Sequence, residues 1–445
     1  MFKMKTITLS LLALLLVMSF ASCASDTTSD LPLPSKDMKA YLQVKVTVEG
    51  SGDTRASRAA KGPQGGEGGD DREPGINKEN DVNSLTVLLY ESDKDDLSDD
   101  NAIIDYVYTF TNLNKVTTSS GSDATYTTVP REIDASIVGK NYHVIVIANA
   151  DDMTSRCKGK ISEVRDLQMS KVCTRDADIT NFSNFIMSSK TDAMIDFTKE
   201  GSETDPYVVN VDIERLAARI DIIPNATYVD TDKGYYYNVM DGTNVIGGFK
   251  LESVTPTKVM TKGEYLIKRV SPNAAVSAVT YFGLEAKDAD NKATNYVVCP
   301  WTKDRTGLTL AEAEGPASLY NVKETTVGEA SYILDYVMEN TTTDNAEDYS
   351  TGLIFKGKYY EETEWDATMK QPKAGSIGKE KEYTYTLRHS DPSGSGTTAD
   401  PMHFGVVRNN IYQVKVEGVE GKSKGIKLTI HVVPWAHYDH GEVIY

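Results

Sequence analysis

The residues best suited to metal chemistry lie near the C-terminal end of the chain and in one acidic stretch. His437, Asp439 and His440 are metal ligands by type. In an extended segment alternate side chains face opposite sides, so only His437 and Asp439 would converge. We therefore interpret these residues as part of a solvated polar tail. Residues 93–101 hold several carboxylates but lack the glycine at the sharp turn of a calcium loop, which favours a solvated turn.

The motifs of common hydrolases and nucleotide-binding proteins do not occur in the sequence. There is neither a G-x-S-x-G nor an H-E-x-x-H motif, and the glycine-rich residues 62–69 are not followed by G-K-[ST]. His143 lies inside a predicted strand and is interpreted as structural. Acidic pairs are abundant, so a two-carboxylate glycosidase stays open as a distant alternative, although no pair stands out. We expect no catalytic residues, no metal and no cofactor, and hence no enzyme.

Cys23 is the clearest candidate for covalent modification. Two lysines precede an apolar run over residues 7–20, which is too short to span a bilayer. The run ends in Phe20-Ala-Ser-Cys23, which resembles a bacterial lipobox with Phe where Leu is usual. We predict a lipoprotein signal peptide over residues 1–22 and a lipidated Cys23, with palmitate among its acyl chains. Ordinary secretory cleavage near Ala21 is the alternative, and it also predicts export.

Three further cysteines, Cys157, Cys173 and Cys299, remain in the mature chain. In an oxidising compartment Cys157 and Cys173 could form a disulfide, which would leave one odd thiol. Their spacing contains no C-x-x-C pair, so we predict no zinc site. A disulfide and buried free thiols are equally compatible with the sequence.

Length and charge limit the fold and the partners. A chain of 445 residues is too long for one ordinary core, so two domains are the default. The chain carries 47 Lys and Arg against 65 Asp and Glu, a net charge of −18, which would repel nucleic acid and anionic membrane surfaces. We therefore expect no nucleic-acid partner. Its 25 Tyr against 10 Phe, with many Thr, Val and Gly, favour strands over helices.

A glycine-rich linker over residues 50–75 contains two sites suited to proteolysis. They are Arg55-Ala56 and Arg58-Ala59, in each of which an arginine precedes a small residue. Arg72 is a poorer candidate because Glu and Pro follow it. An exposed linker of small residues is accessible to proteases. The alternative is a flexible linker in which these arginines are simply solvated.

The strand predicted over residues 41–48 precedes this linker. Leu42, Val44, Val46 and Val48 alternate with polar residues, which predicts a half-buried strand and, read locally, an ordinary amphipathic edge strand. A cleavable linker separates it from everything it must pack against, so we interpret it as a removable strand. Its removal would uncover the pockets of these four aliphatic side chains, and the lost burial is worth roughly 6–12 kcal/mol. This is comparable with the stability of a whole domain, about 5–15 kcal/mol.

The rest of the chain reads as many short strands separated by turn-rich loops, which predicts an all-β fold of two sandwiches with minor short helices. Strands are predicted over residues 82–90, 103–110, 126–129, 142–149, 185–187, 207–213, 249–254, 278–284, 296–298, 352–360, 383–387, 411–419 and 426–435, and a short helix over 161–169. After a tether, strand and linker over residues 23–75, we place one domain at 76–213 and a second at 214–435. Residues 436–445 form a tail.

Several of these pieces, in this order and spacing, resemble the fimbrillin family, the subunits of type V pili in Bacteroidales. The resemblance rests on the lipobox with residues 42–48 and Thr54-Arg-Ala56, on residues 82–90 and 142–149, on Glu214-Arg-Leu-Ala-Ala-Arg219, and on residues 404–421 followed by 432–435. It implies two transthyretin-like β-sandwich domains, export as a lipoprotein to the outer membrane, cleavage after Arg by a trypsin-like protease, and polymerisation by strand exchange. By the family pattern the cut falls just after the first strand, where Arg55-Ala56 matches best and Arg58-Ala59 is close behind.

We therefore expect a structural pilus subunit at the cell surface that supports adhesion. Its partners would be copies of itself or related pilins, the Arg-specific protease, a lipid anchor before cleavage, and a host glycan or protein. The donor would be the tail, with Val443, Ile444 and Tyr445 as the apolar residues, and Val443 and Tyr445 filling the pockets. Residues 426–432 alternate better but would complete the second domain. The alternative function is a non-polymerising or tip-type surface adhesin.

Overall fold

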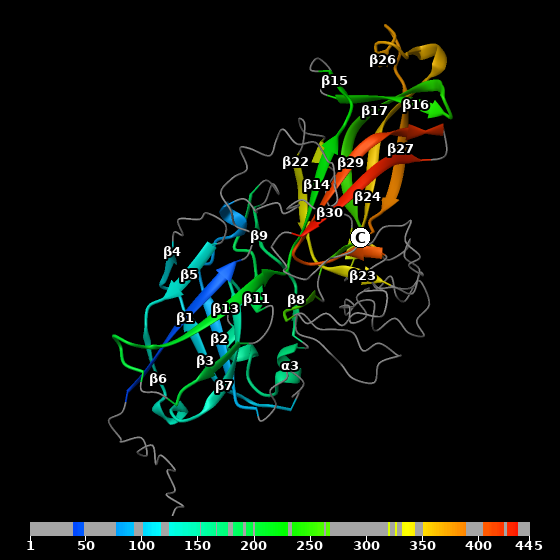
Figure 1. The fold of residues 1–445 in the computed structure, drawn as a ribbon. Coiled ribbons are helices and arrows are strands. Elements are labelled where there is room, and N and C mark those ends of the chain that lie inside the picture. The colour runs from blue at the N-terminus through cyan, green and yellow to red at the C-terminus, as the bar shows by residue number, and fades with distance from the viewer. Residues whose placement is uncertain are drawn as a thin grey trace, which may run out of the picture.

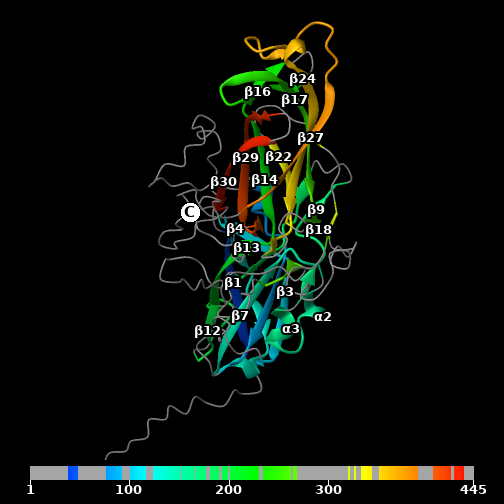
Figure 2. The same cartoon turned by 90° about the vertical axis from the view of Figure 1, so that its right-hand side faces the viewer.

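The computed structural model describes residues 39–48, 77–92 and 101–434, the last range with internal gaps, of which 268–318 and 389–403 are the longest. These residues form strands with a few short helices. They build two lobes, each with its own sheet, that follow one another along the molecule (Figures 1 and 2). The predicted all-β fold of two tandem sandwiches is confirmed.

The first sandwich is built from one ten-stranded sheet within the described residues. Its strands are β1 (Ala40–Val48), β2 (Leu85–Tyr90), β3 (Ile104–Phe110), β4 (Leu113–Val116), β5 (Ala124–Thr128), β6 (Arg131–Ile133), β7 (Asn141–Ala148), β11 (Met187–Ser189), β12 (Ala193–Asp196) and β13 (Tyr207–Arg215). The main path is β3-β2-β7-β11-β13-β1-β5-β4, with β12 beside β7 and β6 beside β1. The inner side chains form a single buried core.

The second sandwich is also built from a ten-stranded sheet among the described residues. Its strands are β14 (Ala218–Pro224), β15 (Thr227–Val229), β16 (Gly234–Asp241), β17 (Asn244–Thr257), β21 (Thr325–Thr326), β22 (Tyr332–Val337), β24 (Gly352–Glu361), β27 (Lys379–Thr386), β29 (Asn410–Glu420) and β30 (Ile426–Pro434). The main path is β22-β14-β29-β16-β17-β24-β27, with β15 beside β16, β21 beside β17 and β30 beside β29.

Short elements connect these strands. The helical ones are η2 (Asn77–Glu79), η3 (Ala135–Ile137), α2 (Met153–Arg156), α3 (Ile161–Arg165) and η4 (Glu362–Glu364). The two-stranded pairs are β9 (Thr174–Arg175) with β10 (Phe182–Ser183), β18 (Val259–Met260) with β20 (Leu319–Tyr320), β8 (Gln168–Met169) with β19 (Glu264–Tyr265), β23 (Asn340–Thr342) with β28 (Phe404–Val406), and β25 (Trp365–Asp366) with β26 (Gln371–Pro372).

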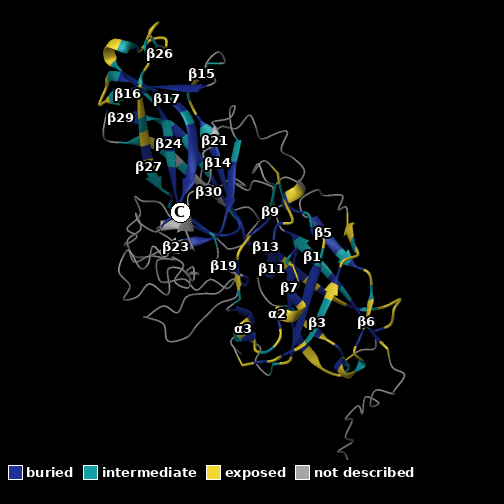
Figure 3. Cartoon of the chain, turned by 180° about the vertical axis from the view of Figure 1, so that it is seen from behind, coloured by how far each residue is buried: buried dark blue, intermediate teal, exposed yellow. Residues whose placement is uncertain are grey.

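The burial of each strand follows its residue pattern. β13 alternates buried and exposed residues, whereas β2 is buried along its whole length and β7 is buried after its first residue (Figure 3). A strand that is covered on both faces has a continuous apolar sequence. In a strand with one solvent-exposed face, apolar and polar residues alternate. The edge strand β27 carries alternating Lys and Glu, and Glu382 forms an ion pair with Lys356 of β24 (Nζ to Oε1, 3.4 Å). Such charges protect a sheet edge from unwanted pairing.

The two sandwiches share a buried junction. Only Leu216 and Ala217 separate β13 from β14, and both are fully buried. Leu266, Tyr336 and Ile411 from the second half of the chain belong to the core cluster of the first sandwich. β19 also pairs with β8 across the junction. Because the apolar core continues through the junction, the lobes are packed against each other rather than connected by a free linker.

The observed strands agree with most of the predicted ones, with shifted ends. The predicted helix over residues 161–169 is wrong in its second half, because Gln168 and Met169 form β8 and pair with β19 of the other lobe. β16 and β22 were not predicted, since their runs of consecutive tyrosines and aliphatics show no clear alternation. The strands predicted over residues 278–284 and 296–298 lie outside the described residues.

Candidate functional site: the groove of the first strand

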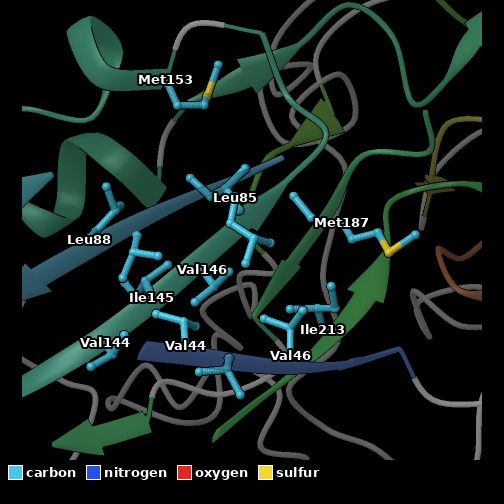
Figure 4. Packing of buried hydrophobic residues seen from close by; sticks show 14 of the residues in the cluster. Val44, Val46, Leu85, Leu88, Val144, Ile145, Val146, Met153, Met187 and Ile213 are labelled. Carbon is cyan, nitrogen blue, oxygen red and sulfur yellow. The ribbon is translucent and has the colours of Figure 1, made fainter. Parts of the chain in front are cut away.

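β1 presents one apolar face to the core of the first sandwich. The side chains of Leu42, Val44, Val46 and Val48 are 0% exposed, and the residues between them are half-buried. Val44 and Val46 lie in this core with Val146 and Ile213 (Figure 4). The alternation predicted for residues 41–48 therefore places every inner side chain out of contact with water.

β1 is not an edge strand, and the local interpretation of this stretch as one is wrong. It runs parallel to β13, from Leu42 opposite Tyr207 to Val48 opposite Ile213. On its other side it is antiparallel to β5 and β6. An alternating pattern reports the two faces of a strand and carries no information about its two edges. The site is therefore a groove with β13 as one wall and β5 with β6 as the other.

Few side-chain bonds hold β1 in this groove. The Val44 amide donates to Thr128 Oγ1, and Gln43 Nε2 donates to the Thr128 carbonyl, both at 2.9 Å. Just before β1, Lys39 Nζ lies 3.0 Å from Glu132 Oε2 in an exposed ion pair that raises the pKa of Lys39. All residues of β1 are described, and none places a charge on the inner face. Backbone ladders and aliphatic contacts, which another apolar strand could also make, therefore supply most of its attachment.

The remaining predicted site residues lie outside the described residues. They are Cys23, Arg55, Ala56, Arg58 and Ala59 on the N-terminal side, and Val443, Ile444 and Tyr445 in the tail. β1 ends at Val48, and the next described element, η2, begins at Asn77. At the other end β30 pairs with β29, from Ile426 opposite Val419 to Pro434 opposite Asn410, so residues 426–434 belong to the second sheet.

Beside the groove, η2 ends in a buried carboxylate that the sequence reasoning did not single out. Glu79 is fully buried and its carboxylate lies 3.4 Å from Arg219 Nη1, while the hydroxyl of Tyr336 donates to it. Arg219 also contacts Asp221, with Nη2 to Oδ2 at 2.6 Å. A buried charge without a partner of opposite sign destabilises the fold. The stability of this cluster therefore depends on the pairing of its carboxylates with Arg219.

A second arginine completes this cluster. Arg215 Nε donates to the Glu79 carbonyl at 2.9 Å, Arg215 Nη1 donates to Asn409 Oδ1 at 3.3 Å, and Arg215 Nη2 donates to Asn80. Burial lowers the pKa of Arg215 to about 10, so it stays protonated at neutral pH. Asn409 has a φ of 57°, in the left-handed region that Asn tolerates better than most residues. The signal in the sequence was two arginines within the apolar run Glu214-Arg-Leu-Ala-Ala-Arg219.

The other candidate groups have structural roles or lie outside the description. His143 is 1% exposed and stacks on Tyr90 with ring centroids 5.0 Å apart, as expected for a structural histidine. Cys157 and Cys173 are free and buried rather than bonded to each other. Over the described part of the chain, no cluster of three potential metal-ligating residues occurs. No helix among these residues is long and apolar enough to cross a membrane.

Comparison with known proteins places the groove in a family. Residues 40–215, which span β1 to β13, match the family described as major fimbrial subunit protein (FimA). The resemblance to fimbrillins is therefore confirmed, and it lies in the first sandwich, which is similar to the fimbrial subunit family. No match was found among curated protein sequences.

Solved structures with a similar arrangement come from Bacteroidales. The tip fimbrial protein Mfa3 from Porphyromonas gingivalis is 13% identical, covers 89% of this chain and 100% of its own, and has a TM-score of 0.39. A fimbrial assembly protein from Parabacteroides distasonis is 12% identical, covers 89% of this chain and 98% of its own, and has a TM-score of 0.38.

Proposed function

We propose that this protein is a structural subunit of a cell-surface fimbria that polymerises by donor-strand exchange and supports adhesion. The family of the first sandwich supports the fimbrial assignment. The observation that carries the mechanism is that β1 is a central strand with a fully buried, uncharged inner face. It is followed directly by residues 49–76, which hold the predicted cleavage sites.

The energetics favour replacement over an empty groove. Loss of β1 would expose the pockets of four aliphatic side chains, worth roughly 6–12 kcal/mol. It would also leave β13 and β5 with unpaired backbone groups along the groove. Unpaired strand edges bind further strands, and donor-strand complementation satisfies both the pockets and the backbone groups at once. Because each subunit would donate to the next without closing a ring, the product would be a filament.

The donor is proposed to be the tail over residues 436–445, with Val443 and Tyr445 as the pocket-filling residues and Ile444 between them. β30 supports this assignment because it pairs along β29 in the second sheet. The tail is thus the chain that follows the last strand of the second sandwich. The incoming strand must present apolar residues at every second position, as Leu42, Val44 and Val46 do.

The proposal includes the export, membrane anchoring and cleavage of the subunit. Export as a lipoprotein acylated on Cys23 would anchor the precursor in the outer membrane, and an Arg-specific protease of trypsin-like specificity would cut after Arg55 or Arg58. The partners would then be other subunits of the polymer and a host glycan or protein. No catalytic activity is included, in keeping with the structural role of fimbrial subunits.

Electrophoresis tests the polymerisation directly. Surface-purified protein is expected to give a denaturation-resistant ladder on an unboiled gel, and the variant Arg55→Ala with Arg58→Ala should abolish it. N-terminal sequencing of the polymer should begin at Ala56 or Ala59. Assembled material that still begins at Cys23 would contradict the cleavage. A chain lacking residues 436–445 should be exported and folded but monomeric, and unchanged polymers from it would refute the donor assignment.

A further inference from the structure

The segment Glu79–Asn80–Asp81, which we call the brace, follows the cleavable linker and lies at the Val48 end of the groove. Its importance comes from the topology of the first sheet. The path runs β13-β1-β5-β4, so among the described strands β5 and β4 are connected to β13 in the sheet only through β1. Removal of β1 therefore cuts the backbone ladder between the two walls of the groove.

The brace bonds to the β5 wall through Tyr126. This tyrosine lies opposite Val46 in the register, and its hydroxyl donates to the Asn80 carbonyl at 3.1 Å and toward Asp81 Oδ1 at 3.4 Å. The pKa of Tyr126 is raised to about 12, chiefly by burial, so the hydroxyl keeps its proton. On the neighbouring β4, Lys115 Nζ lies 3.9 Å from Asp81 Oδ1 and 5.7 Å from the Tyr126 ring centroid.

The brace bonds to the β13 wall through Arg215, the last residue of that strand. Arg215 Nε donates to the Glu79 carbonyl at 2.9 Å, and Nη2 donates to Asn80 Oδ1. The brace itself is fixed from outside the groove, because the Glu79 carboxylate contacts Arg219 of the second sandwich and Asn149 Nδ2 donates to the Asp81 carbonyl at 2.8 Å. None of these bonds involves an atom of β1.

We propose that the brace holds the β5 wall and the β13 wall in place when β1 leaves, so that the groove stays open for an incoming strand. This inference rests on the proposed strand exchange and adds the device that prevents the vacated walls from separating. Bonds that bypass β1 keep their energy when β1 detaches, and a wall that is already positioned spares the incoming strand the cost of ordering it.

Hydrogen exchange of the full, uncleaved chain tests the brace, because β1 detaches transiently without any cut. In the natural protein, amides of residues 40–48 should exchange faster than those of β5 that pair with β4. Tyr126→Phe removes the hydroxyl and keeps the ring. It should accelerate amide exchange in β5 by about tenfold, the effect of one buried hydrogen bond near the top of its usual range. The exchange rates of β5 and β1 would then become similar.

Tyr207→Phe is the matched control. Tyr207 lies on β13 at the opposite end of the same groove, and its hydroxyl donates to the Phe197 carbonyl at 3.3 Å rather than to the brace. It should leave the difference between β1 and β5 intact. Asn80→Ala should speed exchange at residues 207–213 on the other wall. Equal exchange of β1 and β5 in the natural protein, or no acceleration of β5 by Tyr126→Phe, would overturn the proposal.

This measurement is independent of assembly. If no ladder forms on gels but the Tyr126→Phe effect appears, the brace stands and polymerisation fails. If polymers form while β5 exchange is unchanged by Tyr126→Phe, the groove exchanges its strand without the brace. The two failures are therefore distinguishable.

Discussion

β1 and β14 are the first strands of their sandwiches and occupy equivalent positions. β1 runs parallel to β13 and antiparallel to β5, and β14 runs parallel to β29 and antiparallel to β22. They differ in what holds them. Both strands place aliphatic side chains in the core, but β14 follows β13 after two buried residues and also carries the buried Arg219–Asp221 pair. β1 is followed by the linker, and all of its buried residues are apolar.

This difference is the one that the proposed exchange requires between a replaceable strand and a permanent one. A buried ion pair is specific for one partner in one register, because any other arrangement leaves a charge without compensation. Aliphatic pockets accept any strand with the right spacing and size. Under the proposed strand exchange, the first position of the sandwich would be exchangeable in one domain and fixed in the other, although the backbone pairing is the same.

The largest effect is expected from a charge placed on the inner face of β1. Val44→Asp would bury a carboxylate within the apolar core cluster of the first sandwich, and we expect a loss of roughly 5 kcal/mol in the free energy of unfolding. Lys45→Asp, on the half-buried outer face of the same strand and opposite the uncharged Asn210 and Thr127, is the control and should change it far less. Denaturant titration followed by circular dichroism measures both. Equal losses in the free energy of unfolding for the two variants would mean that the inner face of β1 is not the face that packs on the core.

β14 should respond to the loss of its buried cation. Arg219→Met leaves Glu79 and Asp221 without their shared partner, and we expect a loss of about 3–5 kcal/mol in the free energy of unfolding. The matched variant Lys39→Met removes a cation from an exposed pair with Glu132, where about 0–1 kcal/mol is expected. A cost for Arg219→Met no larger than for Lys39→Met would remove the charge-based distinction between the two strands.

Truncation of one aliphatic side chain in each strand sharpens the comparison. Leu42→Ala and Ile222→Ala remove fully buried side chains, and each should lower the free energy of unfolding by about 2–5 kcal/mol. After proteolytic nicking of the linker, only Leu42→Ala should speed the release of the β1 fragment, as monitored by size-exclusion chromatography with mass spectrometry. Faster release with Ile222→Ala as well would show that the two strands are coupled.

The smallest effect concerns the thiols of the first sandwich. Burial raises the pKa of Cys157 to about 12 and that of Cys173 to about 11, so both are protonated at pH 8. Iodoacetamide should label neither in the native chain and both after unfolding, as read by peptide mass spectrometry. Since these pKa values lie above the ordinary value of 9.0, their contribution to stability should be complete below pH 9 and fall as the pH rises toward 12. Rapid native labelling would contradict this burial.

The limits of sequence reasoning are visible at particular residues. β7 and β13 were predictable, since a continuous apolar run and a period of two are local patterns. The strand at Gln168 was not, because a two-residue strand exists only through its partner β19. Glu79 gave no local sign of burial, since its charge alone predicts exposure. In its cluster Glu79 contacts Arg219 and Tyr336, which lie 140 and 257 positions further along the chain.

The sequence by itself determined that residues 41–48 form a strand with Leu42, Val44, Val46 and Val48 inside, because burial on one face depends on alternation between neighbours. It also predicted the sandwich class and the resemblance to fimbrillins. Only the tertiary structure decided that β1 lies in the middle of its sheet, with β13 on one edge and β5 on the other. Edge pairing and the brace beside it depend on residues distant in the chain, which no local pattern encodes.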